Sequence, residues 1–334
     1  GTLPHSTQVT MTSVTSATLH TGAHMPMVGL GTWKIPKDVC ADVVHTAIKL
    51  GYRHLDCACD YGNEKEVGEG LASAIKAGDV KREEVFVTSK LWNTFHKAEH
   101  VGPAFRRSLT DLGLEYMDLY LIHFPLCLKY VDPEVRYPPE WIHDPKAENP
   151  QMVFEPVALR ETWAAMEKLV DEGLVKHIGV ANFPNALLMD LLSYARVKPA
   201  VNQVEIHPNL QQPGLVRYNE SVGVVVTSYS NFGGLSYEAF NETARATPSL
   251  LSGTPAIKKI ADAHGKSTAQ VILRWCNQRN LIVIPKSLNE DRLKQNLDIF
   301  DFTLTDEEMS EMAKLEQGLR FNDPGVYANY PIFD

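Results

Sequence analysis

Residues 54–71 read HLDCACDYGNEKEVGEGL and mark the point where a short apolar strand gives way to a charged helix. Asn63 followed by Glu66 predicts a capping box at the start of that helix. Asp56 and Tyr61 lie at the junction between the two elements, together with two cysteines. A strand, a polar junction and a helix form the unit that repeats along the chain.

The alternation of strand and helix continues over almost the whole sequence. The predicted strands are short β-branched or apolar runs at residues 27–30, 52–56, 85–90, 118–123, 176–181, 201–205, 222–229 and 281–285. Longer amphipathic segments separate them, and several of these end on glycine, as helix C-termini often do. Eight such units favour an α/β fold of the closed (β/α)8 TIM-barrel type over an open sheet.

Three further segments complete the predicted barrel. Residues 17–27 carry Gly22 at a turn and predict an N-terminal β-hairpin across the barrel floor. The connections 124–156 and 230–254 are too long to be simple turns. Both follow the C-terminal end of a strand, so we expect long loops at the C-terminal face, where barrel active sites lie.

Composition and charge narrow the class of protein. The chain has 334 residues, of which 44% are hydrophobic and 22% charged, as in globular proteins with a core. We predict a single domain over residues 14–334, preceded by a tail at 1–13 that is disordered or a cloning remnant. No apolar run approaches the ~20 residues of a bilayer span. The net charge of −9, without a basic block, argues against nucleic-acid and anionic-membrane surfaces.

The cysteines indicate a reducing compartment. They are five in number and unevenly spaced, which does not suit a disulfide framework, so we predict a cytoplasmic protein. Cys57 and Cys59 form C-x-C rather than the C-x-x-C of zinc sites, and the sequence contains no H-E-x-x-H motif. We therefore predict no metal site.

Four chemically active side chains are expected to meet at one mouth of the barrel. Asp56, Lys90 and His123 end three successive strands, and Tyr61 follows the first of them. An ammonium group beside a phenol lowers the pKa of the phenol, and a carboxylate can hold that ammonium group. A neutral histidine can orient a carbonyl oxygen nearby. Each residue alone also fits a structural role, but their joint occurrence favours catalysis.

These segments resemble the signature of the aldo-keto reductase superfamily. The matching stretches are DCACDYGNE (56–64), VTSKLWN (87–93), LYLIHFP (119–125), GVANF (179–183) and IPKS (284–287). YSNFGGLSYEAFN (229–241) and LRFNDP (319–324) most resemble the xylose (aldose) reductases of yeasts and fungi. The resemblance implies a barrel that binds NADPH across its C-terminal mouth. It also implies that Tyr61 is the proton donor, that Lys90 and Asp56 lower its pKa, and that His123 positions the carbonyl group.

Two glycine-rich segments, GLGTWK (29–34) and GEGLAS (68–73), do not fit the Rossmann fingerprint G-x-G-x-x-G. The resemblance instead assigns the nicotinamide to the ends of the later strands. Asn182 and Gln203 match the pair that hydrogen-bonds the carboxamide, and Tyr229 matches the aromatic residue on which the ring stacks. Ala181 stands where the family usually has serine, so one family hydrogen bond is missing.

The resemblance assigns the adenosine end to the segment after the last strand. Lys286, Ser287 and Arg292 match the 2′-phosphate site, where cations suit an anion, and Asn296 matches the adenine edge. Two departures concern cofactor choice: Leu288 replaces an asparagine, and Glu238 lies one place from the acidic residue of dual-specific enzymes. They favour NADPH and leave weaker use of NADH open.

Trp33, Phe124 and Asn322 match substrate-pocket positions of the family, and aromatic walls with a few polar groups suit an open-chain aldose. The expected function is NADPH-dependent reduction of xylose-like aldoses and other aldehydes to alcohols. A sugar-phosphate or broad carbonyl reductase of the same family is the alternative. A non-catalytic NADPH-binding sensor subunit is a third hypothesis, and both monomer and homodimer remain open.

Overall fold

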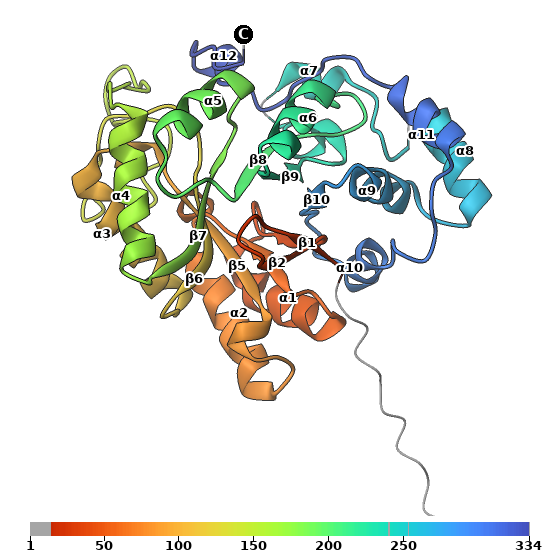
Figure 1. Ribbon diagram of the computed structural model, residues 1–334, viewed down its shortest axis with the longest axis horizontal. Helices are drawn as coiled ribbons and strands as arrows, with labels where there is room; N and C mark the ends of the chain where they lie inside the picture. The colour runs from red at the N-terminus through yellow and green to blue at the C-terminus, as the bar shows by residue number, and fades with distance from the viewer. Residues whose placement is uncertain (1–14, 240, 253, 334) are drawn as a thin grey trace, which may run out of the picture.

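Eight parallel strands form one sheet in the computed structural model, which describes residues 15–239, 241–252 and 254–333 (Figure 1). The strands follow one another around the sheet in chain order: β3 Leu30–Gly31, β4 His54–Asp56, β5 Phe86–Leu91, β6 Met117–Ile122, β7 Val175–Ala181, β8 Val201–Glu205, β9 Val225–Tyr229 and β10 Ile282–Val283. The first and last strands meet, because Val28 bridges to Val283 and the Gly29 N–H donates to the Val283 carbonyl at 2.8 Å. The predicted closed barrel is confirmed.

The helices lie on the outside of the sheet, as Figure 1 shows. Those that follow the strands are α1 Lys37–Leu50, α2 Glu64–Ala77, α3 Ala98–Leu112, α4 Leu159–Asp171, α5 Asn185–Tyr194, α6 Pro213–Ser221, α9 Thr268–Gln278 and α10 Glu290–Leu297. The additional ones are α7 Glu242–Ala246, α8 Pro255–His264, α11 Asp306–Ala313 and α12 Pro324–Tyr327. Short 3₁₀ turns include η1 Cys59–Tyr61 and η4 Gly233–Ser236. Helices α1 and α3 end at Gly51 and Gly113, both in the left-handed region, as their position predicts.

The predicted capping box at the start of α2 is wrong. Asn63 does occupy the position before the helix, but its side chain makes no capping hydrogen bond. Its amide instead donates to the backbone carbonyls of Thr32 and Ile35, at 2.9 and 3.1 Å. The residue therefore joins the β3–α1 connection to the β4–α2 connection.

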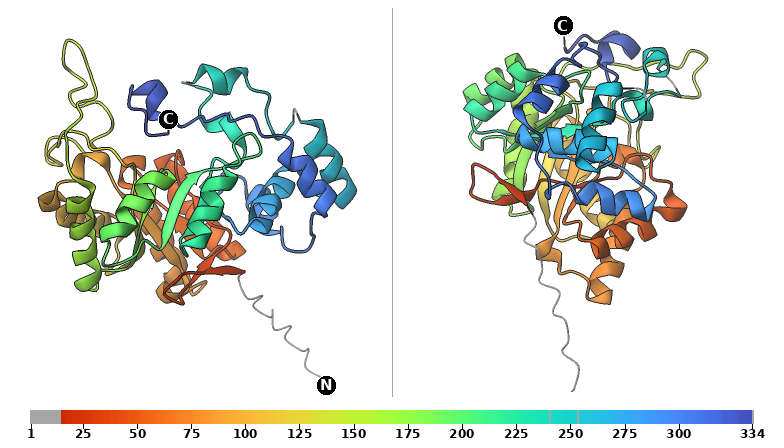
Figure 2. Two further views of the ribbon diagram at one scale, coloured as in Figure 1. Left: turned by 45° about the horizontal axis from the view of Figure 1, so that its top comes forward. Right: turned by 90° about the vertical axis from the view of Figure 1, so that its right-hand side faces the viewer.

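The two ends of the barrel have different coverings. The predicted hairpin is present, with β1 Ser16–Thr18 pairing antiparallel with β2 His24–Pro26. Met25 belongs to the same buried cluster as Leu119 and Leu121 of β6, so the hairpin closes the floor. Figure 2 shows the hairpin at one end of the barrel and α12 with the 124–156 loop at the other. That second end carries the C-termini of the strands.

The predicted tail at residues 1–13 lies outside the described residues, and the single domain over residues 14–334 remains a prediction. Every helix in the described part of the chain is too short or too polar to cross a bilayer.

Closure of the barrel depends on the absence of a side chain at Gly31. A Cβ atom at this position would lie 2.5 Å from the backbone carbonyl oxygen of Ile284. We expect Gly31→Ala to lower the free energy of unfolding by about 1–3 kcal/mol, measured by urea denaturation, because backbone must move. Gly214→Ala is the matched control: it meets nothing within 4 Å in α6, and alanine favours helix, so stability should hold or rise.

Candidate active site

A buried ion pair stands at the centre of the C-terminal mouth. Lys90 lies one residue before the end of β5 and donates to Asp56 Oδ2 at 2.8 Å, and the two side chains are 0% and 2% exposed. The same ammonium group donates to the Cys57 carbonyl at 2.8 Å and to the Tyr61 hydroxyl oxygen at 3.1 Å. The structure thus brings together three of the predicted catalytic residues, and all three ammonium hydrogens have acceptors.

The expected net lowering of the Tyr61 pKa is wrong, and so is the expectation that Asp56 contributes to it. Burial raises the pKa of this phenol well above its usual range, and the carboxylates of Asp56 and Asp60 raise it further. The phenol is therefore protonated at neutral pH, as a proton donor must be. Because Lys90 donates to the phenol oxygen, the phenol hydrogen is left for an acceptor in the mouth.

His123 lies beside the phenol as a neutral imidazole. The two rings are edge-on with centroids 5.9 Å apart. Burial lowers the pKa of His123 well below its usual value, and Lys90 and His96 lower it further. A neutral ring retains one N–H donor, so it can hydrogen-bond a carbonyl oxygen without adding charge to the mouth. All four predicted catalytic side chains are therefore neighbours.

The polar residues predicted for the nicotinamide lie against this group. Gln203 of β8 donates from Nε2 to Asp56 Oδ1 at 2.7 Å, which satisfies the second carboxylate oxygen. Asn182 follows β7 and donates to the His123 carbonyl at 2.8 Å, and its Oδ1 accepts from the Tyr229 hydroxyl at 2.6 Å. Two side-chain amides and one phenol thus line the ends of β7, β8 and β9.

The residues predicted for the adenosine end lie further along the mouth, around the start of α10. Lys286 and Arg292 are exposed, whereas Ser287 and Asn296 are buried. Burial lowers the pKa of Lys34, and the nearby Lys286 ammonium lowers it further. Cationic side chains therefore gather here although the protein is acidic overall.

The predicted pocket residues come from three separate segments of the chain, and each contacts an aromatic side chain. Phe124 is buried and its ring centroid is 5.2 Å from that of His123. Trp33 is partly exposed and packs on Tyr237 at 5.4 Å. Asn322 comes from the C-terminal segment and donates to the Tyr229 hydroxyl at 3.1 Å.

Residues 27–317 match the Aldo/keto reductase family. The chain belongs to this family. It is 52% identical over 317 residues to the "Probable NAD(P)H-dependent D-xylose reductase xyl1" of Arthroderma otae, with 94% of this chain and 95% of the relative covered. Identity to the "NAD(P)H-dependent D-xylose reductase xyl1" of Aspergillus niger is also 52% over 317 residues, covering 94% and 98%. The predicted resemblance to fungal xylose reductases is confirmed.

Solved structures of the family have the same fold. The aldose reductase of Schistosoma japonicum superposes with a TM-score of 0.84 at 40% identity, covering 96% of this chain and 99% of that chain. An aldo-keto reductase of Bombyx mori in complex with NADP superposes with a TM-score of 0.83 at 35% identity, with the same coverage.

Two residues around the mouth of this aldo/keto reductase were not predicted from the sequence. Trp92 packs edge-on against His123 with centroids 5.2 Å apart, and its position two residues after Lys90 was the available signal. Glu205, which ends β8, is fully buried and binds the C-terminal segment. It lies two residues after Gln203, on the same face of the strand, which could have indicated a place at the mouth.

The central ion pair should contribute strongly to stability, because one partner alone would leave an uncompensated buried charge. We expect Asp56→Asn to lower the free energy of unfolding by about 3–5 kcal/mol in urea denaturation. Glu172→Gln, which breaks the half-exposed pair with Arg106, is the control and should cost less than about 1 kcal/mol. Equal losses in the two variants would contradict the assignment of Asp56 as the buried counter-charge.

Proposed function

We propose that this protein is an NADPH-dependent aldose reductase that reduces xylose-like sugars and other aldehydes to alcohols. The contact of Asp56, Lys90 and Tyr61 beside the neutral His123 supports this most strongly, because it combines a protonated donor with a fixed cation. The names of the similar fungal proteins, NAD(P)H-dependent D-xylose reductases, favour the same substrate class.

The chemical roles follow from the contacts. Tyr61 gives its proton to the carbonyl oxygen as negative charge develops there, and the resulting phenolate remains 3.1 Å from the Lys90 ammonium group. His123 holds the carbonyl oxygen beside the phenol through its N–H group. Asp56 holds the Lys90 ammonium group in place through their 2.8 Å contact.

The strand ends on the other side of the mouth fit a nicotinamide cofactor. Amides such as Asn182 and Gln203 can both donate to and accept from a carboxamide, and the Tyr229 ring offers a face for stacking. When bound, NADPH supplies the hydride that adds to the carbonyl carbon. The protein residues supply position, charge and the proton.

The adenosine end is assigned to the segment around α10. Lys286, Ser287 and Arg292 offer two cations and a hydroxyl group for the 2′-phosphate, and Asn296 is assigned to the adenine. Lys286 lies close enough to Lys34 to lower its pKa, after the larger effect of burial. A bound anion such as the 2′-phosphate would relieve this repulsion between the two cations, which supports a phosphate site here.

The substrate is assigned to the space between Trp33, Phe124 and Asn322. Aromatic rings can pack on the carbon chain of an open aldose, and the Asn322 amide can bind one of its hydroxyl groups. A cytoplasmic location is part of the proposal, supported by five cysteines that are all free and buried.

Steady-state oxidation of NADPH by the protein, measured with xylose, glucose 6-phosphate and methylglyoxal as alternative substrates, tests the proposal directly. Xylose should be turned over well, and NADH should support a lower kcat/KM than NADPH. A strong preference for the phosphate ester would overturn the substrate assignment. Failure to oxidise NADPH with any aldehyde would instead favour a sensor role.

Replacing the proton donor should affect chemistry more than binding. We expect Tyr61→Phe to lower kcat by about 10²–10⁴-fold, since only the hydroxyl group is removed. NADPH binding, measured by quenching of tryptophan fluorescence, should persist. Tyr120→Phe is the matched control, because this hydroxyl group is buried without a hydrogen-bond partner among the described residues and the ring packs on Phe105 of the outer helix α3. Unchanged turnover in Tyr61→Phe would reject the role.

The 2′-phosphate assignment predicts a difference between the two cofactors. Arg292→Ala should raise the KM for NADPH by about 10–100-fold, the worth of a charge-assisted hydrogen bond, and leave the KM for NADH nearly unchanged. Lys294→Ala on the same helix, which removes a cation paired with Glu290, is the control and should change neither value. Equal weakening of both cofactors by Arg292→Ala would place the phosphate elsewhere.

A further inference from the structure

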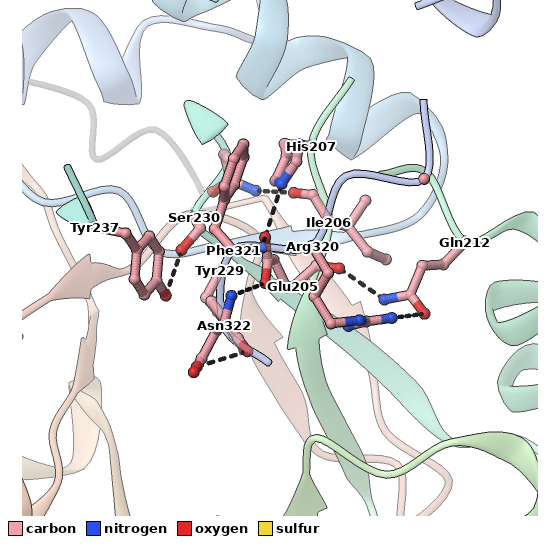
Figure 3. A network of polar contacts seen from close by, with 12 residues as sticks. Glu205, Ile206, His207, Gln212, Tyr229, Ser230, Tyr237, Arg320, Phe321 and Asn322 are labelled. Carbon is pink, nitrogen blue, oxygen red and sulfur yellow. Dashed lines mark hydrogen bonds and ion pairs between the residues drawn. The ribbon is translucent and has the colours of Figure 1, made fainter. Parts of the chain in front are cut away.

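Glu205 is a completely buried carboxylate for which the proposed chemistry has no use. Its Oε1 accepts from the Phe321 backbone N–H at 2.9 Å and lies 2.9 Å from His207 Nε2, and its Oε2 accepts from the Asn322 backbone N–H at 2.8 Å (Figure 3). Within the described residues, His207 is its only ion-pair partner. A buried carboxylate is costly unless it is hydrogen-bonded, and two of its three partners are successive backbone groups of one loop.

The loop is also anchored before and after residues 321 and 322, the two that bind Glu205. Before them, the backbone N–H groups of Gln317 and Leu319 both donate to the Asn209 carbonyl at 3.1 Å. After them, Tyr327 packs on Trp141 of the 124–156 loop with ring centroids 5.3 Å apart. Glu205 holds the stretch between these anchors, which is the part that crosses the barrel mouth.

The position of this stretch decides where the Asn322 amide lies. Its Nδ2 donates to the Tyr229 hydroxyl at 3.1 Å, and its Oδ1 accepts from the Tyr327 hydroxyl at 3.1 Å. The Tyr229 hydroxyl donates in turn to Asn182, which donates to the His123 carbonyl. A continuous series of hydrogen bonds therefore runs from Glu205, through the loop backbone, to the proposed catalytic residues.

Apolar packing alone does not explain the contact. Phe321 is buried and its ring stacks on His207 with centroids 5.2 Å apart, which fixes the Phe321 side chain. The peptide that follows is held at both of its polar groups: its carbonyl oxygen, on Phe321, accepts from Asn241 Nδ2 at 3.0 Å, and its N–H, on Asn322, donates to Glu205. Together with the Phe321 N–H, Glu205 thus accepts from two successive N–H groups through its two oxygens, which orients the backbone at Asn322.

We propose that Glu205 is a positioning residue for the aldose: it sets the place of the Asn322 amide at the mouth without touching the substrate. This inference rests on the proposed function, in which Asn322 binds a sugar hydroxyl group. A change at Glu205 is therefore expected to affect the KM of hydroxylated substrates. The contacts of Tyr61 and Asp56 with Lys90, in which Glu205 takes no part, should stay in place.

Glu205→Gln tests the proposal, because the amide NH2 would face a backbone N–H and only one acceptor would remain. We expect the KM for xylose to rise about 10-fold or more, with kcat within about 2-fold of the wild type. The KM for butanal, which has no hydroxyl groups, and the Kd for NADPH should each stay within about 2-fold. Should this variant be insoluble, Glu205→Asp, which keeps the charge but is one methylene shorter, provides the same test.

Two controls separate positioning from general stability. Glu167→Gln alters another buried glutamate that accepts two successive backbone N–H groups, from Arg196 and Val197 at 2.7 and 2.8 Å, but on the outer helix α4. It should lower Tm without changing the KM for xylose. The double variant Glu205→Gln with Asn322→Ala should have the KM of Asn322→Ala alone, since both changes act through one amide.

The outcomes distinguish this inference from the proposed function. An equal rise in KM for xylose and butanal, or additive effects in the double variant, would overturn the positioning role. A wild-type protein that reduces butanal but not xylose would instead overturn the aldose assignment on which the inference rests.

Discussion

The ammonium group of Lys90 has no contact with solvent, and much of the mouth is arranged around that constraint. Removing a charge from water costs on the order of several kcal/mol unless all its hydrogens have acceptors and a counter-charge is close. All three acceptors come from β4 and the turn that follows it: Asp56, the Cys57 carbonyl and Tyr61. The turn must therefore keep its shape, which Gly62 permits by adopting the left-handed conformation after η1. The proton donor is held in place by the group that would stabilise its anion.

The same carboxylate joins the two halves of the mouth. One oxygen of Asp56 binds Lys90, and the other accepts from Gln203, which lies 147 residues later in the chain on β8. Only a closed barrel brings these strand ends together, so the geometry of the proton donor and that of the amide side chains are not independent. The C-terminal segment adds a third connection, through Glu205 and Asn322. The loops that cover the mouth are thus bonded to the strand ends that carry the proposed chemistry.

Burial shifts the pKa values of Tyr61 and His123 in opposite directions, and both shifts favour the uncharged form of the side chain. It raises the pKa of the Tyr61 phenol and lowers that of the His123 imidazole, because in each case the charged form is disfavoured away from water. Both groups are uncharged near neutrality, and the ion pair beside them is the charged element of the cluster. A carbonyl oxygen placed between phenol and imidazole would meet two hydrogen-bond donors. The cation is close enough to act as negative charge develops.

The sequence by itself determined the barrel, its hairpin floor and the residue types at the strand ends. Parallel strands covered by helices are apolar runs, and their last polar residues are recognisable, as for Asp56, Lys90 and His123. Only the tertiary structure decided the direction of the Tyr61 pKa shift, the partners of the Asn63 side chain and the contact of Glu205 with residues 321 and 322. The physical reason is the same for all three. Periodicity and residue type are local properties of a chain, whereas desolvation and hydrogen bonding depend on which distant segments pack against a side chain.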